Sequence, residues 1–377
     1  MKSVWPVLLI LLLTIHSKAD DNDGIESEDG DAAKFYNMTY REQQSALEKK
    51  IFYNYRNNRR PVRNVSQPTT VSMHWHVIHV SVNANEQTMT LHGHLYMSWF
   101  DEFLVWDPKD FNGVRTARCK KWQVWQPKVR VINSVSGVNS LFEISTQGHA
   151  LLEMQPDNRA KVEIYPTFSI KVGCLMDFSD FPNDVNKCNV AVFTTEPMSQ
   201  VQINIYYALP PSLSFAWGDQ SKKRIISDFN VVNITNNVVY YSEGNYTELA
   251  PIVENELSQT WTMVMTTVVF SRHSPFFFAG VFLPNIIGTL MCVLPFFIDS
   301  CAFASFTLVS NMIILSIFLQ DAFSKFPLAT KGVPKSLIYY DVLLISTTVA
   351  LLIHIVVMFA TAARFPLPDC LNPRPFF

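Results

Sequence analysis

The sequence predicts an all-β sandwich ectodomain followed by an all-α transmembrane bundle. Short stretches that alternate apolar and polar residues, separated by turns, run through residues 36–274, and this pattern is typical of a sandwich. Three uncharged apolar stretches follow within residues 275–363. Only 16% of the 377 residues are charged, against about 25% in soluble domains, so part of the chain is expected to avoid water. The net charge of −2 argues against nucleic acid as a partner.

Residues 1–19 are interpreted as a signal peptide. Lys2 precedes an apolar run from Val7 to Ile15, and Ser17 and Ala19 are the small residues that signal peptidase accepts. The alternative is a buried N-terminal helix. Residues 20–35 form an acidic leader. The ectodomain is therefore expected in the secretory lumen, and its Asn-x-Ser/Thr motifs predict glycosylation at Asn37, Asn64, Asn233 and Asn245, all of which precede the apolar stretches.

The apolar stretches predict three membrane helices, over about residues 276–298, 300–323 and 337–363. Each uncharged stretch has about the 20 residues that a helix needs to cross hydrocarbon, and helices are expected there despite Pro284 and Pro295 because lipid offers no hydrogen-bond partners. The alternative is three buried helices of a soluble protein. With the N-terminus outside, residues 364–377 become a short cytoplasmic tail, although Lys325, Lys331 and Lys335 in the outer loop run against the positive-inside tendency.

The ectodomain is expected to begin with a helix over Arg41–Tyr55, ended by Arg60-Pro61. Two alternating runs, Val71–Val77 and Met89–Trp99, are joined by a short polar link and predict a hairpin. Further strands are predicted at Val124–Val131, Leu141–Ile144, Lys161–Tyr165, Val190–Phe193, Val201–Tyr207, Val238–Tyr241 and Thr262–Ser271.

Five of the nine histidines fall within the hairpin. If a bulge near Ile78 keeps the inner face apolar, His76 lies opposite His94, with His74 and His92 diagonal to them. Cross-strand side chains approach within about 5 Å, so His76 and His94 are candidate zinc ligands or a coupled proton site. The alternative is exposed histidines without a role.

Cys174 and Cys188 enclose thirteen residues that include Phe181-Pro182 and Asp184. In an oxidising lumen this pair should form a disulfide, which constrains the unfolded chain by about 3 kcal/mol. Thirteen residues with Phe-Pro-x-Asp between two cysteines resemble the signature of the Cys-loop pentameric ligand-gated ion channels. The motifs around it agree in type and order: Arg60-Pro61-Val62, Trp99-Phe-Asp101, Leu104-x-Trp106-x-Pro108, Trp125-x-Pro127, Asn133, Pro284, Asp299-Ser300 and Val333-Pro334.

This resemblance implies five homologous subunits around an axis, ligand pockets between neighbouring subunits, and a pore lined by the second membrane helix. It also implies that Phe181 and Pro182 touch the membrane domain and transmit ligand binding; the alternative is that the loop is a structural staple. The pocket positions are His94, Ile132, Phe193, Tyr240, Tyr241 and Tyr246. Aromatic rings hold a quaternary ammonium by cation–π attraction. Because His94, Ile132 and Thr195 replace family aromatics and the tip lacks a cysteine pair, acetylcholine is not expected as direct ligand unless a partner subunit supplies the rings.

The predicted pore stripe has the spacing of one helix face, and its residues are Ser305, Val309, Met312, Ser316, Gln320 and Phe323. The family's gate leucine falls at Met312 and its cation-selecting glutamate at Ala302, so the sequence does not indicate which ions would pass. Thr307, Ser310 and Asn311 lie on the opposite side, where contacts between helices are favoured over a second water-lined face.

The sequence thus predicts an acetylcholine-receptor-like channel subunit, or an accessory subunit, in the plasma membrane. The alternative is a non-conducting receptor-like protein acting in signalling or endocytosis on vesicles, because the departures resemble divergent nematode acetylcholine-receptor-like proteins, one of which is tied to coelomocyte uptake. The family's fourth helix is not expected in the residues after Ala363, and the alternatives are a natively short gene product and a truncated sequence. No enzyme motif and no cofactor site is expected. Cys119, left over in the ectodomain, is either a buried thiol or a subunit cross-link.

Overall fold

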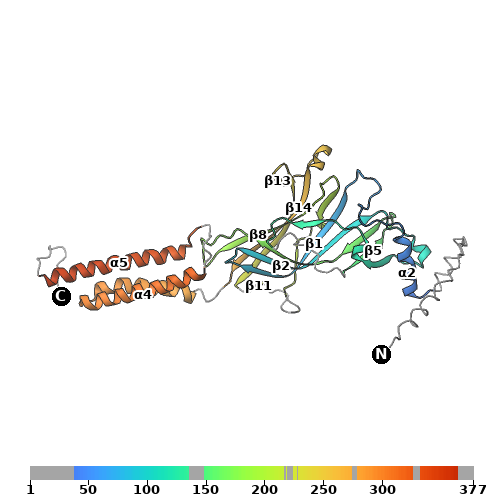
Figure 1. The fold of residues 1–377 in the computed structure, drawn as a ribbon. Helices are drawn as coiled ribbons and strands as arrows, with labels where there is room; N and C mark the ends of the chain where they lie inside the picture. The colour runs from blue at the N-terminus through green and yellow to red at the C-terminus, as the bar shows by residue number, and fades with distance from the viewer. Residues whose placement is uncertain are drawn as a thin grey trace, which may run out of the picture.

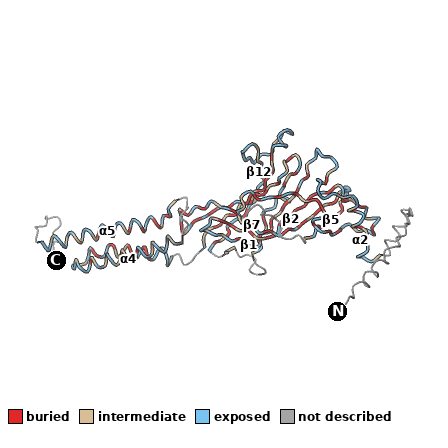
Figure 2. Tube along the Cα trace, in the orientation of Figure 1, coloured by how far each residue is buried: buried red, intermediate tan, exposed pale blue. Residues whose placement is uncertain are grey.

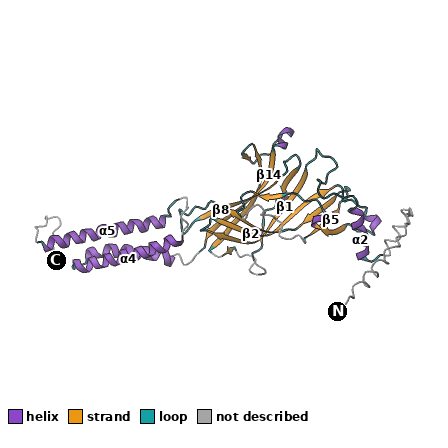
Figure 3. Cartoon of the chain, viewed as in Figure 1, coloured by secondary structure: helices purple, strands orange, loops and turns teal. Residues whose placement is uncertain are grey.

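The computed structural model describes residues 38–135, 148–215, 218, 224–226, 228–273, 278–325 and 332–363. The chain forms an elongated molecule with a β-sandwich at one end and a helical bundle at the other (Figure 1). Figure 3 shows that the long helices lie apart from the strands, and that the short helix α2 lies at the far end of the sandwich. The predicted fold class is confirmed. The predicted signal peptide, leader, C-terminal tail, Asn37 and the strand at Leu141–Ile144 lie outside the described residues.

Helix α2 (Tyr40–Ile51) begins at a capping box in which Thr39 and Glu42 satisfy each other's backbone N–H groups. Leu47 and Ile51 are buried, as the four-residue spacing predicts. The helix ends four residues before the predicted Tyr55. Tyr55 instead donates a hydrogen bond to Asp101 at 2.6 Å and accepts one from the Trp125 N–H, so a tertiary contact replaces the expected last turn.

The first sheet contains the hairpin. Antiparallel β1 (Thr69–Asn83) and β2 (Thr88–Asp101) form its centre. The sheet order is β10-β1-β2-β6-β5-β3, with β7 also paired to β2 and β9 to β1. The remaining strands are β3 (Thr116–Lys120), β5 (His149–Met154), β6 (Ala160–Ile164), β7 (Thr167–Gly173), β9 (Val201–Ile205) and β10 (Ser212–Leu213).

The second sheet has the order β11-β12-β14-β8-β4, with β13 paired to β12. Its strands are β4 (Val129–Val131), β8 (Val185–Thr194), β11 (Ile225–Ile226), β12 (Phe229–Ser242), β13 (Asn245–Thr247) and β14 (Thr260–Arg272). The two sheets share one core, whose largest fully buried side chains include Trp75, Trp99, Phe178 and Phe270. Figure 2 shows this burial following the strands, while the helices of the bundle are mostly exposed.

The structure corrects the strand assignment in two ways. Of the predicted strand Val124–Val131, only Val129–Val131 is paired as a strand (β4), and residues 124–128, which follow the 3-10 turn η2 (Lys121–Gln123), belong to no strand. Strands β3, β5 and β7 were not predicted. All three alternate buried and exposed residues, but lysine, arginine or glutamate at their outward positions makes the pattern resemble a loop.

A glycine fixes the hairpin at its bulge. The register shifts at Ile78, as predicted, and Gly93 pairs with Val77 beside that shift. A Cβ on Gly93 would overlap the carbonyl oxygen of His76, which is backbone and cannot swing aside.

We expect Gly93→Ala to lower the melting temperature of the detergent-solubilised full chain, because overpacking at a site this tight costs about 1–3 kcal/mol. The control is Gly173→Ala on β7, where a Cβ meets only Val135 Cγ1 at 3.6 Å. Scanning fluorimetry measures the melting temperatures. Equal melting temperatures of the two variants would contradict the prediction.

The bundle contains three helices long and apolar enough to cross a membrane within the described residues. The first comprises the π-turn η6 (Phe278–Phe282), α3 (Leu283–Val293) and the 3-10 turn η7 (Leu294–Phe297), so Pro284 and Pro295 fall where the helix changes type. Helices α4 (Cys301–Lys325) and α5 (Lys335–Ala362) pack side by side (Figure 1). These three helices lie within a few residues of the predicted bounds.

One amide joins the three membrane helices. Asn311 of α4 is 1% exposed, and its Nδ2 donates to the Gly288 carbonyl at 3.0 Å and to Thr347 Oγ1 at 3.3 Å. The predicted polar contact between helices is therefore confirmed for Asn311. For Thr307 and Ser310 it is wrong, because their hydroxyls donate to carbonyls of their own helix.

Candidate ligand-binding and coupling sites

Aromatic residues gather at the tip of the β12–β13 hairpin, which projects from the sandwich (Figure 1). The ring of Tyr241 lies 5.1 Å from that of Tyr246 and 6.4 Å from that of Trp261 on β14. The Trp261 indole donates to the Thr195 carbonyl at 3.4 Å, which links the tip to the end of β8. The predicted strand at Thr262–Ser271 left out Trp261, whereas β14 (Thr260–Arg272) includes it. These three rings form one aromatic face, whereas Tyr240, the neighbour of Tyr241 on β12, lies on the opposite face of the sheet.

The other predicted pocket residues are distributed over both sheets. Phe193 on β8 pairs with Met263 of β14 in the same sheet as the tip, and Ile132 is 47% exposed just after β4. His94, in contrast, lies on β2 of the first sheet. It lines an open groove of about 670 Å³ with His74, His76, Tyr96, Glu163, Tyr165, Thr167, Tyr206, Leu209 and Ser212. A single chain therefore does not place His94 in the same pocket as the tip tyrosines.

The predicted histidine register is confirmed. His76 lies opposite His94, with stacked rings 6.3 Å apart, and His74, opposite Tyr96, is diagonal to His94. The bulge also places His92 opposite His79, with rings 5.8 Å apart, a pair that was not predicted. Among the described residues, no three His, Cys, Asp or Glu side chains form a metal-binding group. Zinc ligation by His76 and His94 therefore stays a prediction that rests on two ligands.

His74 occupies the inner end of the same groove. Its Nε2 lies 2.7 Å from Ser212 Oγ. Burial, followed by repulsion from His76, lowers the pKa of His74, so this imidazole is biased toward its neutral form. On the other side of the groove Glu163 accepts from the Tyr96 hydroxyl at 2.8 Å and pairs with Lys161 at 2.6 Å. Its carboxylate is thus already neutralised within the chain.

The unpaired cysteine of the ectodomain is buried, whereas the described glycosylation motifs are exposed. Cys119 is 4% exposed, and burial raises the pKa of its thiol to about 12, so the alternative of a subunit cross-link is wrong for this fold. Asn64, Asn233 and Asn245 are all exposed, as glycosylation requires. Their modification stays a prediction.

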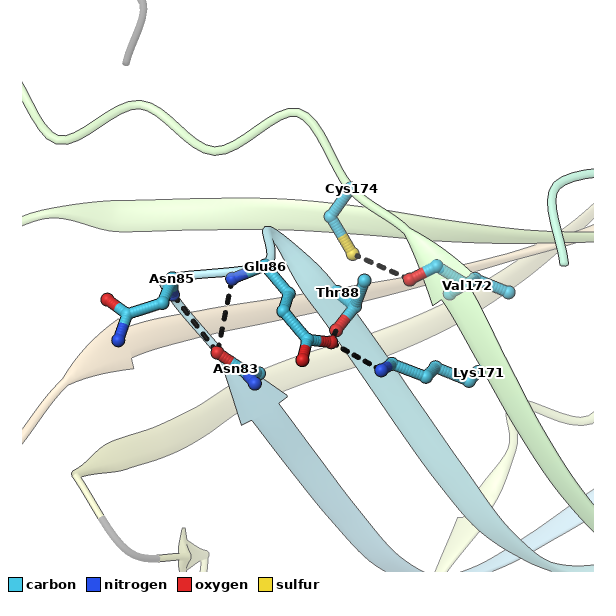
Figure 4. A network of polar contacts seen from close by, with 7 residues as sticks. All are labelled: Asn83, Asn85, Glu86, Thr88, Lys171, Val172 and Cys174. Carbon is cyan, nitrogen blue, oxygen red and sulfur yellow. Dashed lines mark hydrogen bonds and ion pairs between the residues drawn. The ribbon is translucent and has the colours of Figure 1, made fainter. Parts of the chain in front are cut away.

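The disulfide between Cys174 and Cys188 is present. It closes the loop that leads from β7 into β8. The turn between β1 and β2 sits against it: the Cys174 N–H donates to the Gln87 carbonyl at 2.8 Å, and Glu86 pairs with Lys171 of β7 (Figure 4). The loop is thereby fixed to both sheets of the sandwich.

The disulfide loop also touches the membrane domain. Asp180 Oδ1 accepts from the Lys335 ammonium at 2.5 Å, and the Ser179 carbonyl accepts from the Lys335 N–H at 3.0 Å, at the start of α5. These contacts come from residues just before the predicted Phe181-Pro182. Phe181 itself is 8% exposed and stacks on the guanidinium of Arg272 at 5.1 Å, while Pro182 is half-buried.

Arg272 is a functional candidate that sequence reasoning missed. It is the last residue of β14, just before the membrane domain, and the faces of Phe178, Phe181 and Phe229 surround its guanidinium. Asp184 of the disulfide loop accepts from its Nε at 2.8 Å and from its Nη2 at 3.2 Å. A charged residue directly before a long apolar stretch was the available signal. The pair ties the disulfide loop to the strand that leads into the first membrane helix.

Four of the six predicted pore residues share one face of α4. Val309, Met312, Ser316 and Gln320 line an open groove of about 450 Å³. Ser305 is half-buried, and its hydroxyl donates to the Cys301 carbonyl at 2.8 Å. Phe323 lies in α4, but its side chain is outside the described residues. The packed face of the helix is a different one, made by Ala304, Leu308, Asn311 and Leu315.

A two-sheet sandwich, closed by a disulfide loop that contacts a bundle of apolar helices, defines a Cys-loop receptor subunit. The chain belongs to the neurotransmitter-gated ion-channel family. The model of the neurotransmitter-gated ion-channel ligand binding domain matches residues 44–273, more than half of the chain. This is a family of receptor channels and not of enzymes.

Three relatives show how far the similarity extends. The acetylcholine receptor-like protein cup-4 of Caenorhabditis briggsae is 48% identical over 368 residues, which cover 97% of this chain and 84% of that protein. The acetylcholine receptor subunit beta of Xenopus laevis is 23% identical over 321 residues (84% of this chain, 61% of that protein). The 5-hydroxytryptamine receptor 3A of Cavia porcellus is 25% identical over 296 residues (78% and 56%). The chain thus spans less than two thirds of these vertebrate subunits.

Proposed function

We propose that this acetylcholine-receptor-like subunit assembles with homologous subunits, in a pentamer, into a ligand-gated channel of the plasma membrane. The ligand pocket would form between two subunits, and the stripe from Ser305 to Phe323 would line the pore. The observation that supports this most directly is the separation of the pocket residues: the tip aromatics and His94 belong to different sheets of one chain. A second subunit would bring its His94 groove to the tip of the first.

The exposed face of α4 supports the same assembly. Val309, Ser316 and Gln320 are exposed in the single chain and share their groove with Met312. The Ser316 hydroxyl donates to the Met312 carbonyl of its own helix at 2.7 Å. The Gln320 amide, in contrast, would be unfavourable in lipid, whereas a water-filled pore supplies hydrogen-bond partners for it. We further propose that the disulfide loop, through Phe181, Pro182 and the Asp180–Lys335 contact, couples the pocket to the pore. With the ectodomain outside, the chain after α5 would be cytoplasmic.

Expression in oocytes, alone and with related subunits, tests the proposal by recording currents evoked by acetylcholine or 5-hydroxytryptamine, for which the relatives are named. Met312→Thr puts a hydroxyl at the expected gate, and an apolar constriction that gates by dewetting becomes easier to hydrate. We expect the half-maximal ligand concentration to fall about tenfold, which corresponds to about 1.4 kcal/mol.

Ile314→Thr is the matched control, because Ile314 is an exposed residue of α4 that lies neither on the predicted stripe nor in its groove. Equal effects of the two variants would reject the pore register. Absence of current in every pairing, with the protein shown to be at the cell surface, would reject conduction.

A further inference from the structure

A groove in the sandwich is lined by three cationic side chains, and none of its described lining residues carries a carboxylate. It has a volume of about 450 Å³. It lies between the turn η2, the segment that leads into β4, and strands β2 and β6. The cations are Lys121, Lys128 and Arg130. This groove shares no residue with the tip aromatics or with the His94 groove, so its function is separate from the proposed channel pocket.

Lys121 is the unusual member of this set, because it is a lysine only 6% exposed. Its N–H donates to the Gly148 carbonyl at 3.0 Å, and its carbonyl accepts from Gln126 Nε2 at 2.5 Å, so its backbone is held in place. Within the described part of the chain, no carboxylate lies within ion-pair distance of its ammonium group. Beside two further cations, and with no carboxylate in reach, this ammonium group is free to donate charge-assisted hydrogen bonds to an anion. An anion bound in the groove would supply a counter-charge.

The other two cations stand at the rim. Lys128 lies 3.7 Å from Glu196, but its side chain is 76% exposed, and ion pairs that exposed contribute little. Arg130 is exposed on β4. Asn57 donates to the Trp122 carbonyl at 2.8 Å and so brings a further amide-bearing loop to the rim. The rim thus offers a guanidinium, an ammonium and amides as hydrogen-bond donors.

The floor of the groove is apolar. Met97, Val129 and Ile164 are buried lining residues, and Pro166 lies beside them. The exposed apolar surface of the groove includes Trp122, which is 58% exposed. Inorganic anions gain nothing from this surface, whereas an apolar ring or chain that covers it is stabilised by about 25 cal/mol per Å². The combination of a recessed ammonium, a guanidinium and an apolar floor favours a ligand that is anionic at one end and apolar at the other.

We propose that this groove binds a small organic carboxylate with an apolar ring or chain. The carboxylate would accept hydrogen bonds from Lys121 and Arg130, which are stronger than neutral ones. The apolar part would lie against Trp122 and over the floor made by Met97, Val129 and Ile164.

Calorimetric titration of the full chain in detergent micelles with benzoate tests this proposal. We expect saturable binding that Lys121→Met weakens about tenfold or more, because a hydrogen bond to a charged group is lost. Lys109→Met is the matched control: Lys109 is exposed, lies outside the groove, and carries the same charge. It is expected to leave benzoate affinity unchanged. Benzyl alcohol, which keeps the ring and lacks the charge, is expected to bind at least about tenfold more weakly than benzoate.

Arg130→Gln provides a second test if Lys121→Met does not fold, because Arg130 is on the surface. This variant is also expected to weaken the binding of benzoate. Unchanged benzoate affinity in the folded variants would overturn the proposal, as would equal affinity for benzyl alcohol. Inorganic sulfate binding as tightly as benzoate would overturn the apolar part of the site.

Discussion

Arg272→Leu is expected to lower the free energy of unfolding by about 3–5 kcal/mol, because it leaves a buried carboxylate without its partner. The Asp184 side chain is 1% exposed and that of Arg272 is 10% exposed, so water does not replace the lost hydrogen bonds. The leucine also gives up the stacking of the guanidinium on three phenylalanine rings. A loss of this size is a large part of the stability of a typical domain, about 5–15 kcal/mol, so the variant should reach the cell surface poorly.

The double variant Arg272→Leu with Asp184→Leu distinguishes two causes of destabilisation: the loss of the ion pair itself and the cost of leaving the Asp184 carboxylate buried without a partner. Replacing both partners by apolar groups is often nearly neutral, so the double variant should recover much of the melting temperature and surface expression lost by the single one. Arg272→Lys should lie between, because lysine cannot form the two-pronged contact. If the double variant is as unstable as the single one, the buried charge is not the cause.

The ion pair between Lys335 and Asp180 provides the contrast. Its side chains are 76% and 65% exposed, and exposed pairs contribute little to stability. Lys335→Gln is therefore expected to leave the melting temperature nearly unchanged. If the disulfide loop couples pocket and pore, the same variant should still shift the ligand concentration for half-maximal current.

Cys174→Ser is expected to lower the free energy of unfolding by about 3 kcal/mol, because the disulfide with Cys188 no longer restricts the unfolded chain. The two cysteines are 14 positions apart, and the freed loop also carries Asp184 and the contacts to α5. Melting curves of the solubilised full chain under non-reducing conditions measure the effect.

Two comparisons test the cause. The double variant Cys174→Ser with Cys188→Ser should melt close to the single one, because one lost sulfur already breaks the bond. Dithiothreitol should destabilise the native chain and leave the variants unaffected. Cys301→Ser, at a free cysteine of the bundle, should behave like the native chain. A native chain that melts identically with and without reductant would contradict the prediction.

Much of the fold could be predicted from the local periodicity of apolar residues in the sequence. The hairpin, its bulge at Ile78 and the pairing of His76 with His94 follow from the period-two pattern, because a slip by one residue would turn every apolar side chain outward. The three membrane helices follow from their length and lack of charge. Strands β3, β5 and β7 escaped prediction because long charged side chains on their outer faces mask the alternation.

The candidate sites also include features that the sequence predicts and features that only the tertiary structure shows. The partnership of Cys174 with Cys188 and the stripe of Val309, Met312 and Ser316 could be read from spacing, since each depends on residues close together in the chain. The separation of His94 from the tip aromatics, the bond from Asn311 to Gly288, and the pairing of Arg272 with Asp184 could not. The last pair joins residues 88 positions apart. Such contacts arise when packed sheets and helices bring distant segments together and exclude water between them, and no periodic pattern along the chain encodes which partner each side chain will meet.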